Sequence, residues 1–138
     1  MWTYNVMIRF IEYSSFIKKI WLFFFQIGAM GGCHQLPERS FRIYDMQFPV
    51  CSRCTGVYLG QLFGIILINN NVHIDLKTSV VFLAVMLIDW LIQYIKVKES
   101  NNLRRLITGL MAGIGLISLN HHILKLFWNL MVIKLHIL

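Results

Sequence analysis

All three cysteines of the chain, and one of its five histidines, lie at the two ends of a single stretch of sequence. Cys33 and His34 begin this stretch, and Cys51 and Cys54 form a C-x-x-C pair at its end. Such a pair places two thiolates on one turn, close enough to share a metal ion or to close into a disulfide. Together with Cys33 and His34 the pair makes a Cys₃His set, which predicts a closed tetrahedral site for zinc or another soft-ligand metal.

Two other interpretations of the cysteines stay open. Arg53 lies between Cys51 and Cys54, and a fixed cation favours the ionised form of neighbouring thiols, as a membrane thiol-disulfide oxidoreductase requires. Three cysteines can also serve as small apolar side chains without a ligand. A bound metal, in turn, can belong to an active site or can only staple a loop in a non-catalytic membrane scaffold. The sequence leaves open whether the protein is an enzyme.

A second set of polar residues lies further along the chain. Asp89 interrupts an apolar run, and Gln93 follows one turn later on the same helix face. An ionisable group in hydrocarbon costs roughly 2.5 to 3.5 kcal/mol on insertion scales, so it usually faces a partner or an aqueous cavity. Asp89 therefore predicts an inward-facing ion pair. The alternative is that Asp89 already lies at the membrane interface, because Lys96 follows within two turns.

Two arginines open the last apolar run. Asn101 is a good capping residue before this run, whereas the charges of Arg104 and Arg105 oppose the dipole of a first helical turn. Anionic lipid headgroups, or a phosphate held at the helix N-terminus, would explain these two charges. The candidate catalytic residues are Asp89, Arg39, Arg53 and Arg104, and the further polar site residues are Gln93, Glu99, Asn101, Arg105 and Thr108.

The composition indicates what kind of element positions these residues. Of the 138 residues, 57% are hydrophobic and 14% are charged, against roughly 25% charged in an ordinary soluble domain. A water-soluble globular protein is excluded, since 13 basic and 6 acidic side chains cannot cover its surface. The formal charge of +7 comes from cations between apolar runs, where they meet lipid headgroups rather than nucleic acid. The sequence contains no nucleotide-binding loop, Ser-His-acid triad or HExxH motif.

Four apolar stretches predict an all-α integral membrane protein, a single domain over residues 1–138 built as a compact bundle of about four transmembrane helices. The expected spans are residues 16–32, 54–72, 78–95 and 106–124, and the Cys/His loop is residues 33–53. Three spans with an N-terminal interfacial helix are the alternative, and residues 125–138 have the mixed character of another interfacial helix. Close helix packing is predicted by glycines at four-residue spacing, namely Gly28 and Gly32, Gly56, Gly60 and Gly64, and Gly109 and Gly113.

The number of spans decides which loops can meet. With four spans, the loops at 33–53 and 96–105 emerge on the same face whatever the orientation, so they can form one site. Lysines and arginines divide six against seven between the two faces, and the positive-inside rule therefore gives no orientation.

The motifs as a group resemble a known family. The sequence CHQLPERSF at 33–41, with CSRCTGVYLG at 51–60, resembles a family of small bacterial membrane proteins catalogued as domain of unknown function 2085. Asp89 with Gln93, and residues 99–102 with Arg104, Thr108 and Gly109, look like later blocks of the same family. The resemblance implies a multi-pass protein of the bacterial inner membrane, and it brings no established activity with it.

Overall fold

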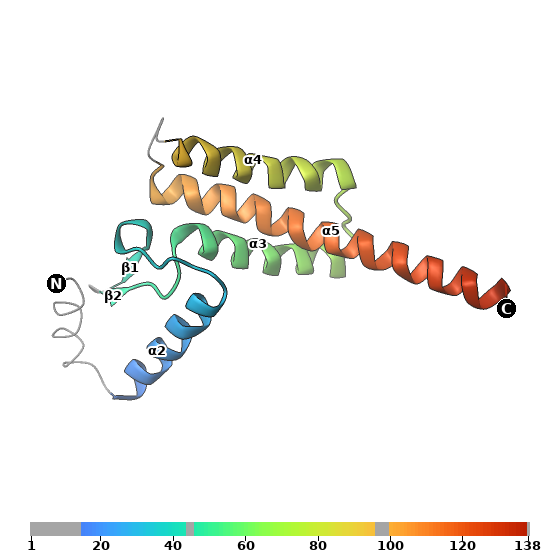
Figure 1. Ribbon diagram of the computed structural model, residues 1–138. Helices are drawn as coiled ribbons and strands as arrows, with labels where there is room; N and C mark the ends of the chain where they lie inside the picture. The colour runs from blue at the N-terminus through green and yellow to red at the C-terminus, as the bar shows by residue number, and fades with distance from the viewer. Residues whose placement is uncertain (1–14, 44–45, 96–99, 138) are drawn as a thin grey trace. The chain divides into compact units, whose positions relative to one another are not determined.

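The computed structural model describes residues 15–43, 46–95 and 100–137, and the expected N-terminal interfacial helix lies outside these residues. The chain divides after Ser52 into two compact units, and each unit is described by itself (Figure 1). In its described residues, the N-terminal unit carries one long helix and a folded loop. The C-terminal unit carries three helices.

Helix α2 (Ser15–Met30) is the main element of the N-terminal unit. A 3-10 turn, η2 (Pro37–Arg39), follows it, and then a short antiparallel pair of strands, β1 (Arg42–Ile43) and β2 (Met46–Gln47). Arg42 pairs with Gln47 across the two strands, and Ile43 pairs with Met46. The expected polar loop after the first apolar stretch is therefore a folded segment with backbone pairing of its own.

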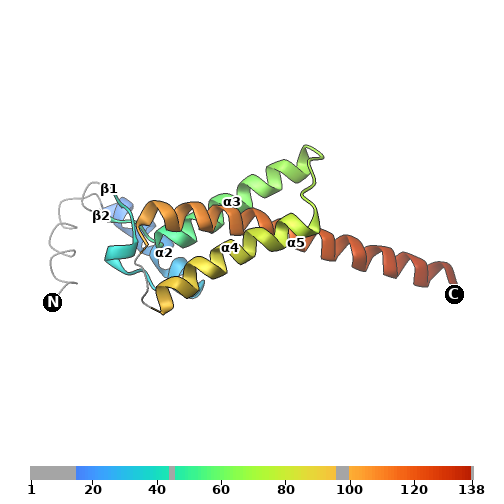
Figure 2. The ribbon, with the colours of Figure 1, turned by 90° about the horizontal axis from the view of Figure 1, so that it is seen from above.

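The C-terminal unit consists of α3 (Ser52–Asn69), which starts at the last residue of the first unit, α4 (Leu76–Tyr94) and α5 (Asn102–Ile137). The three helices lie side by side in both views, and the C-terminal half of α5 continues past the other two (Figure 2). Asp75 caps α4, because its carboxylate accepts a hydrogen bond from the backbone N–H of Thr78. The Thr78 side chain and backbone, both donating to this carboxylate, hold the pKa of Asp75 below its usual value of 3.8.

Glycines bring the backbones of α3 and α5 into direct contact. A Cβ atom on Gly56 or Gly60 would fall against the carbonyl oxygens of Leu106 and Leu110, at a separation that real Cβ atoms do not reach. From the opposite side, a Cβ atom on Gly109 or Gly113 of α5 would fall equally close to the carbonyl oxygens of residues 53 and 57. The predicted close packing of these two helices over glycine is confirmed.

Gly32 has a different role from the one expected. No atom lies within 4 Å of a Cβ built on it, and its φ angle is +77°. The N–H groups of Gly32 and Cys33 donate to the carbonyls of Ala29 and Gly28, at 3.0 and 3.1 Å. These bonds form a Schellman motif, in which a left-handed glycine ends the helix. Gly32 therefore stops α2 and does not pack against another helix.

The described part of the chain buries small and polar side chains and exposes large apolar ones. The buried hydrophobic residues are Cys33, Ala112 and Ile114, whereas the polar residues Ser52 and Ser79 are buried completely and Asp89 almost completely. Exposed leucine, isoleucine and phenylalanine side chains cover all four long helices. Such an apolar exterior suits lipid and would aggregate in water.

Among the residues that the structure describes, two helices are long and apolar enough to cross a membrane, at Leu76–Tyr94 and Asn102–Lys134. Helix α2 has only 16 residues, and α3 has 18, with a polar first turn, so the expected count of four spans is not confirmed. Helix α5 also continues through the boundary expected at residue 124, where a separate interfacial helix was predicted. The reason is local, because residues 116–137 contain neither glycine nor proline to end it.

Candidate functional site

Cys33 owes its position to the end of α2. It follows Gly32 directly, and its N–H closes the Schellman motif on the carbonyl of Gly28. The chain then turns sharply at Gln35, which has a φ angle of +48°. The Gln35 amide donates to the carbonyls of Phe25 and Pro49, so it ties α2 to the segment just before the second cysteine group.

A buried glutamine completes this framework. The side-chain amide of Gln47 donates to the carbonyl of Gln35, and its backbone carbonyl accepts a hydrogen bond of 2.9 Å from the indole of Trp21. Two glutamines and a tryptophan therefore fix the two ends of the loop relative to each other. Neither glutamine carries a recognisable motif for this role, and sequence reasoning missed Gln47.

Ser52 joins the loop to α3. Its side chain is completely buried, and its hydroxyl donates to the carbonyl of Arg39 at 3.0 Å. Ser52 is also the first residue of α3, and it stands between Cys51 and Cys54. The hydroxyl therefore ties the residue that begins α3 to the 3-10 turn η2. Sequence reasoning missed this role as well, although the position inside the C-x-x-C pair was a possible signal.

The three cysteine sulfurs come together. The Sγ atoms of Cys33, Cys51 and Cys54 all lie within 4.8 Å of one another, and all three thiols are free of disulfides. Cys33 and Cys51 both belong to the first unit, where the N–H of Cys51 donates to the sulfur of Cys33 at 3.1 Å. Cys54 follows Cys51 by one turn, in the first turn of α3. These three residues are close enough to hold a metal ion.

The structure does not place the other predicted residues of the loop in this group. His34 is exposed, and it is not among the three residues whose ligand atoms converge. Arg39 is also exposed, and its carbonyl, rather than its guanidinium, takes part in the loop through Ser52.

Asp89 is the centre of a second cluster, which lies entirely within the C-terminal unit. Its side chain is only 3% exposed. Arg53 of α3 donates to Oδ2 at 2.8 Å, and the Nε of Arg104 on α5 lies 2.7 Å from Oδ1. The second contact is an ion pair without hydrogen-bond geometry, since Oδ1 has no hydrogen-bond partner among the described residues. One carboxylate therefore forms ion pairs with two guanidinium groups.

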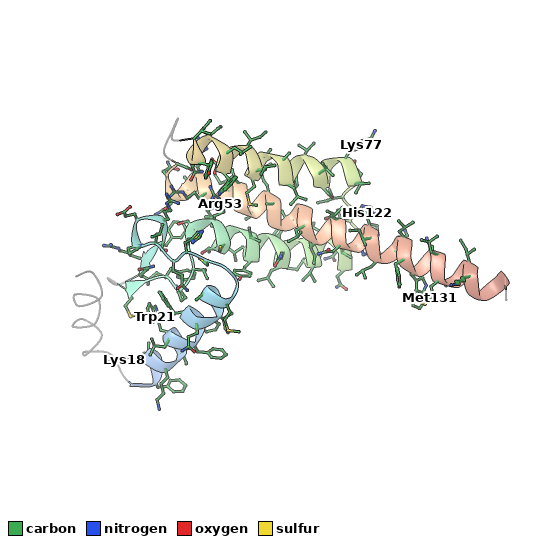
Figure 3. All side chains as sticks on the ribbon, in the orientation of Figure 1. Lys18, Trp21, Arg53, Lys77, His122 and Met131 are labelled. Carbon is green, nitrogen blue, oxygen red and sulfur yellow. The ribbon has the colours of Figure 1, made fainter. Side chains whose placement is uncertain are left out.

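Gln93 links this pair to a third arginine. Its amide nitrogen donates to Asp89 Oδ2 at 2.6 Å, and its amide oxygen accepts from the Nε of Arg105 at 3.2 Å. Arg105 is buried and also contacts Asn102. The expectation of an inward-facing ion pair at Asp89 agrees with this arrangement. Arg53, labelled in Figure 3, lies at the end of α3 beside the ends of the other two helices.

The remaining predicted polar residues serve the backbone of α5. Asn101 is exposed and caps the helix, because its side-chain oxygen accepts from the N–H of Arg104 at 2.9 Å. Thr108 is buried, and its hydroxyl donates to the carbonyl of Arg104 at 3.0 Å. Glu99 lies outside the described residues.

Comparison with known proteins agrees with these features. The model of a family described as predicted membrane protein, domain of unknown function 2085, matches residues 33–119, which include both clusters. The chain belongs to this family. The match confirms the resemblance seen in the cysteine and arginine motifs. The membrane location is supported by the family description together with the two candidate spans.

Two relatives cover much of the chain. An uncharacterised protein of Methanothermobacter thermautotrophicus is 45% identical over 89 residues, which are 61% of this chain and 79% of the relative. An uncharacterised protein of Methanocaldococcus jannaschii is 33% identical over 129 residues, or 89% of this chain and 80% of the relative. Both relatives are archaeal. The expectation of a family confined to bacteria is therefore wrong. No solved structure matches the chain.

Proposed function

We propose that this chain is a multi-pass protein of the cell membrane that binds a zinc ion through Cys33, Cys51 and Cys54. The observation that carries the proposal is the convergence of the three sulfurs within 4.8 Å. A tetrahedral zinc ion with Zn–S bonds of about 2.3 Å separates its sulfur ligands by about 3.8 Å. The cysteines therefore need only a small inward movement to coordinate one ion.

The donor set favours zinc over harder metals. Three thiolates are soft ligands, which suit zinc or another soft-ligand metal and not magnesium or calcium. The backbone N–H donated to the sulfur of Cys33 is the kind of supporting hydrogen bond that metal ligands receive. His34 is the proposed fourth ligand, since it neighbours Cys33, and it would have to turn from its exposed position.

The metal would neighbour the polar cluster through Arg53, which stands between two of its ligands in the sequence and pairs with Asp89. If the protein is catalytic, Asp89, Arg39, Arg53 and Arg104 are the proposed reacting or substrate-binding residues. The partner is the lipid bilayer, and its anionic headgroups would meet the arginines that end the helices.

Metal content of the purified full-length protein tests the proposal. We expect close to one zinc per chain, lost in Cys51→Ser and retained in His73→Ala, a histidine outside the cysteine group. His34→Ala is expected to weaken the retention of zinc against a chelator if His34 is the fourth ligand. A zinc content near zero, with all three thiols alkylated freely, would refute the metal site.

The same cysteines support a second candidate, a thiol-disulfide oxidoreductase. Cys51 and Cys54 form no disulfide, are partly exposed and have sulfurs within 4.8 Å of each other, so they can close into a disulfide after a small movement. In that case Cys54→Ala would trap a mixed disulfide on Cys51 in cells. Thiols whose redox state does not change under oxidants would count against this candidate.

A non-catalytic scaffold is distinguished by Asp89. If the metal only staples the loop, Asp89→Asn should leave the cellular function intact, provided that the protein still accumulates. Loss of function in a variant that accumulates normally and keeps its zinc would favour an active site.

A further inference from the structure

The arginine and aspartate side chains at one end of the C-terminal unit are not matched in charge. Arg53 and Arg104 share the single carboxylate of Asp89. Among the residues that the structure describes, the Nε of Arg53 is buried and has no hydrogen-bond partner. Two cations against one carboxylate leave an excess of positive charge.

The position of this excess decides which anion would meet it. Asp89 and Gln93 lie in the last two turns of α4, and Arg104 lies in the first turn of α5. These are the ends of the two candidate membrane spans, at Tyr94 and Asn102. In a bilayer, the ends of spans lie in the headgroup layer, where lipid phosphates are concentrated.

Asp89 holds the two guanidinium groups in place without saturating them. Arg53 uses one Nη on the carboxylate, and Arg104 uses Nε. A guanidinium has five N–H donors in a planar fork that matches a phosphate, so each arginine keeps donors for a second anion. The Arg104 side chain is 38% exposed and the Arg53 side chain 19%, so Arg104 is the more accessible of the two.

We propose that Arg53 and Arg104, oriented by Asp89, bind a phosphate group at the membrane surface. The phosphate belongs to a phospholipid headgroup or is a free phosphate ion, since both present the same oxygens to the arginines. The N-terminal end of α5 adds the favourable dipole of a long helix. This inference rests on the membrane location in the proposed function and not on the metal, so the two can fail separately.

The test uses the full-length protein in vesicles of phosphatidylcholine with a minor fraction of phosphatidylglycerol. Native mass spectrometry then measures which lipid stays bound after extraction. We expect retention of phosphatidylglycerol over phosphatidylcholine, reduced about tenfold in Arg104→Gln, because a charge-assisted hydrogen bond is lost. Lys77→Gln is the matched control, since it removes an exposed cation from the first turn of α4 instead. Its retention should equal that of the unmodified protein.

A second arm identifies the source of the phosphate. In vesicles of phosphatidylcholine alone, inorganic phosphate should raise the melting temperature above that in chloride of equal ionic strength if the free ion is the ligand. Retention of phosphatidylglycerol without this rise identifies the headgroup. The proposal is overturned if the unmodified protein shows neither of these two effects. It is also overturned if Arg104→Gln and Lys77→Gln retain phosphatidylglycerol equally. Zinc content measured on the same samples should be the same in all variants.

Asp89→Asn gives a result of opposite sign. A structural cluster that binds nothing predicts only loss of stability in this variant. Asparagine at this position can still accept hydrogen bonds from the arginines but no longer neutralises their charge, so Asp89→Asn should tighten phosphatidylglycerol retention while it lowers the melting temperature. Should Asp89→Asn not accumulate, the Arg104→Gln comparison and the phosphate arm on the unmodified protein still decide the matter.

Discussion

Substitution of Gly60 by alanine should destabilise the protein, although alanine is the better helix former. A Cβ on Gly60 would lie far inside contact distance of the Leu110 carbonyl oxygen, and 3.0 Å from the Cα of Gly113 and from the backbone nitrogen of Ile114. All three obstacles are backbone atoms of α5, so no side-chain rearrangement can relieve them. Optimal contact distances of about 3.5 to 4.0 Å require the two helices to separate by more than about 1 Å.

The size of the effect is a difference between two terms. Overpacking of this kind costs about 1 to 3 kcal/mol, and alanine recovers about 1 kcal/mol of helix propensity relative to glycine. Because the obstacles are backbone atoms, the overpacking cost should lie at the upper end of its range, about 3 kcal/mol, and we expect a net loss of about 2 kcal/mol for Gly60→Ala. The assay is unfolding in mixed micelles with increasing dodecyl sulfate, followed by far-ultraviolet circular dichroism.

Gly64 provides the control within the same helix. Its Cβ would collide with the Cγ2 methyl of Ile117, which is a side-chain atom. Ile117→Leu removes that branch, so the double variant Gly64→Ala/Ile117→Leu should regain the stability lost in Gly64→Ala alone. The reasoning is refuted if Gly60→Ala is as stable as the unmodified protein, or if Ile117→Leu rescues Gly60→Ala as well as it rescues Gly64→Ala.

Three further predictions concern the polar contacts. Ser52→Ala should lower stability by about 1 kcal/mol and weaken zinc retention, because it removes the part-buried hydrogen bond to the carbonyl of Arg39; unchanged values in unfolding and metal assays would contradict this. Asp75 has a lowered pKa, so the stability from its cap is complete above pH 3.8 and is lost as the pH falls through its folded pKa. In Thr78→Val the pKa of Asp75, followed by carbon-detected NMR, should rise toward 3.8, and an unchanged value would argue against the hydroxyl as its main cause. Asp89→Ala should cost about 3 kcal/mol, the lower end for a broken buried ion pair, since Arg53 and Arg104 keep partial exposure; a loss below 1 kcal/mol would mean that the pair is not structural.

The sequence was most informative where one residue type has few structural uses. A carboxylate within an apolar run needs a cation, and the ion pairs of Asp89 follow from that cost. Glycines four residues apart predict a backbone contact in the same way, and the contacts of Gly56 and Gly60 agree. The three cysteines converge as their spacing suggested.

The sequence was less informative where tertiary context decides. Gln47 and Ser52 are ordinary polar residues, and only the folded loop shows that their hydrogen bonds hold it together. His73 carries no motif, yet its ring stacks on His121 with centroids 5.2 Å apart, a pairing between residues far apart in the sequence. Gly32 shows the same limit, because glycine serves equally well at a helix contact and at a helix end.

The glycine contacts also restrict how the three helices of the C-terminal unit can move. Because α3 and α5 touch through their backbones at several successive turns, they can only move together, and Arg53 and Arg104 keep a constant separation. Near the N-terminal end of α4, the carbonyl of Ser79 lies against Gly115 of α5. Ser79 is about 15 Å along the helix axis from Asp89. A tilt of α4 would therefore pivot near Ser79 and withdraw Asp89 from two arginines that stay in place.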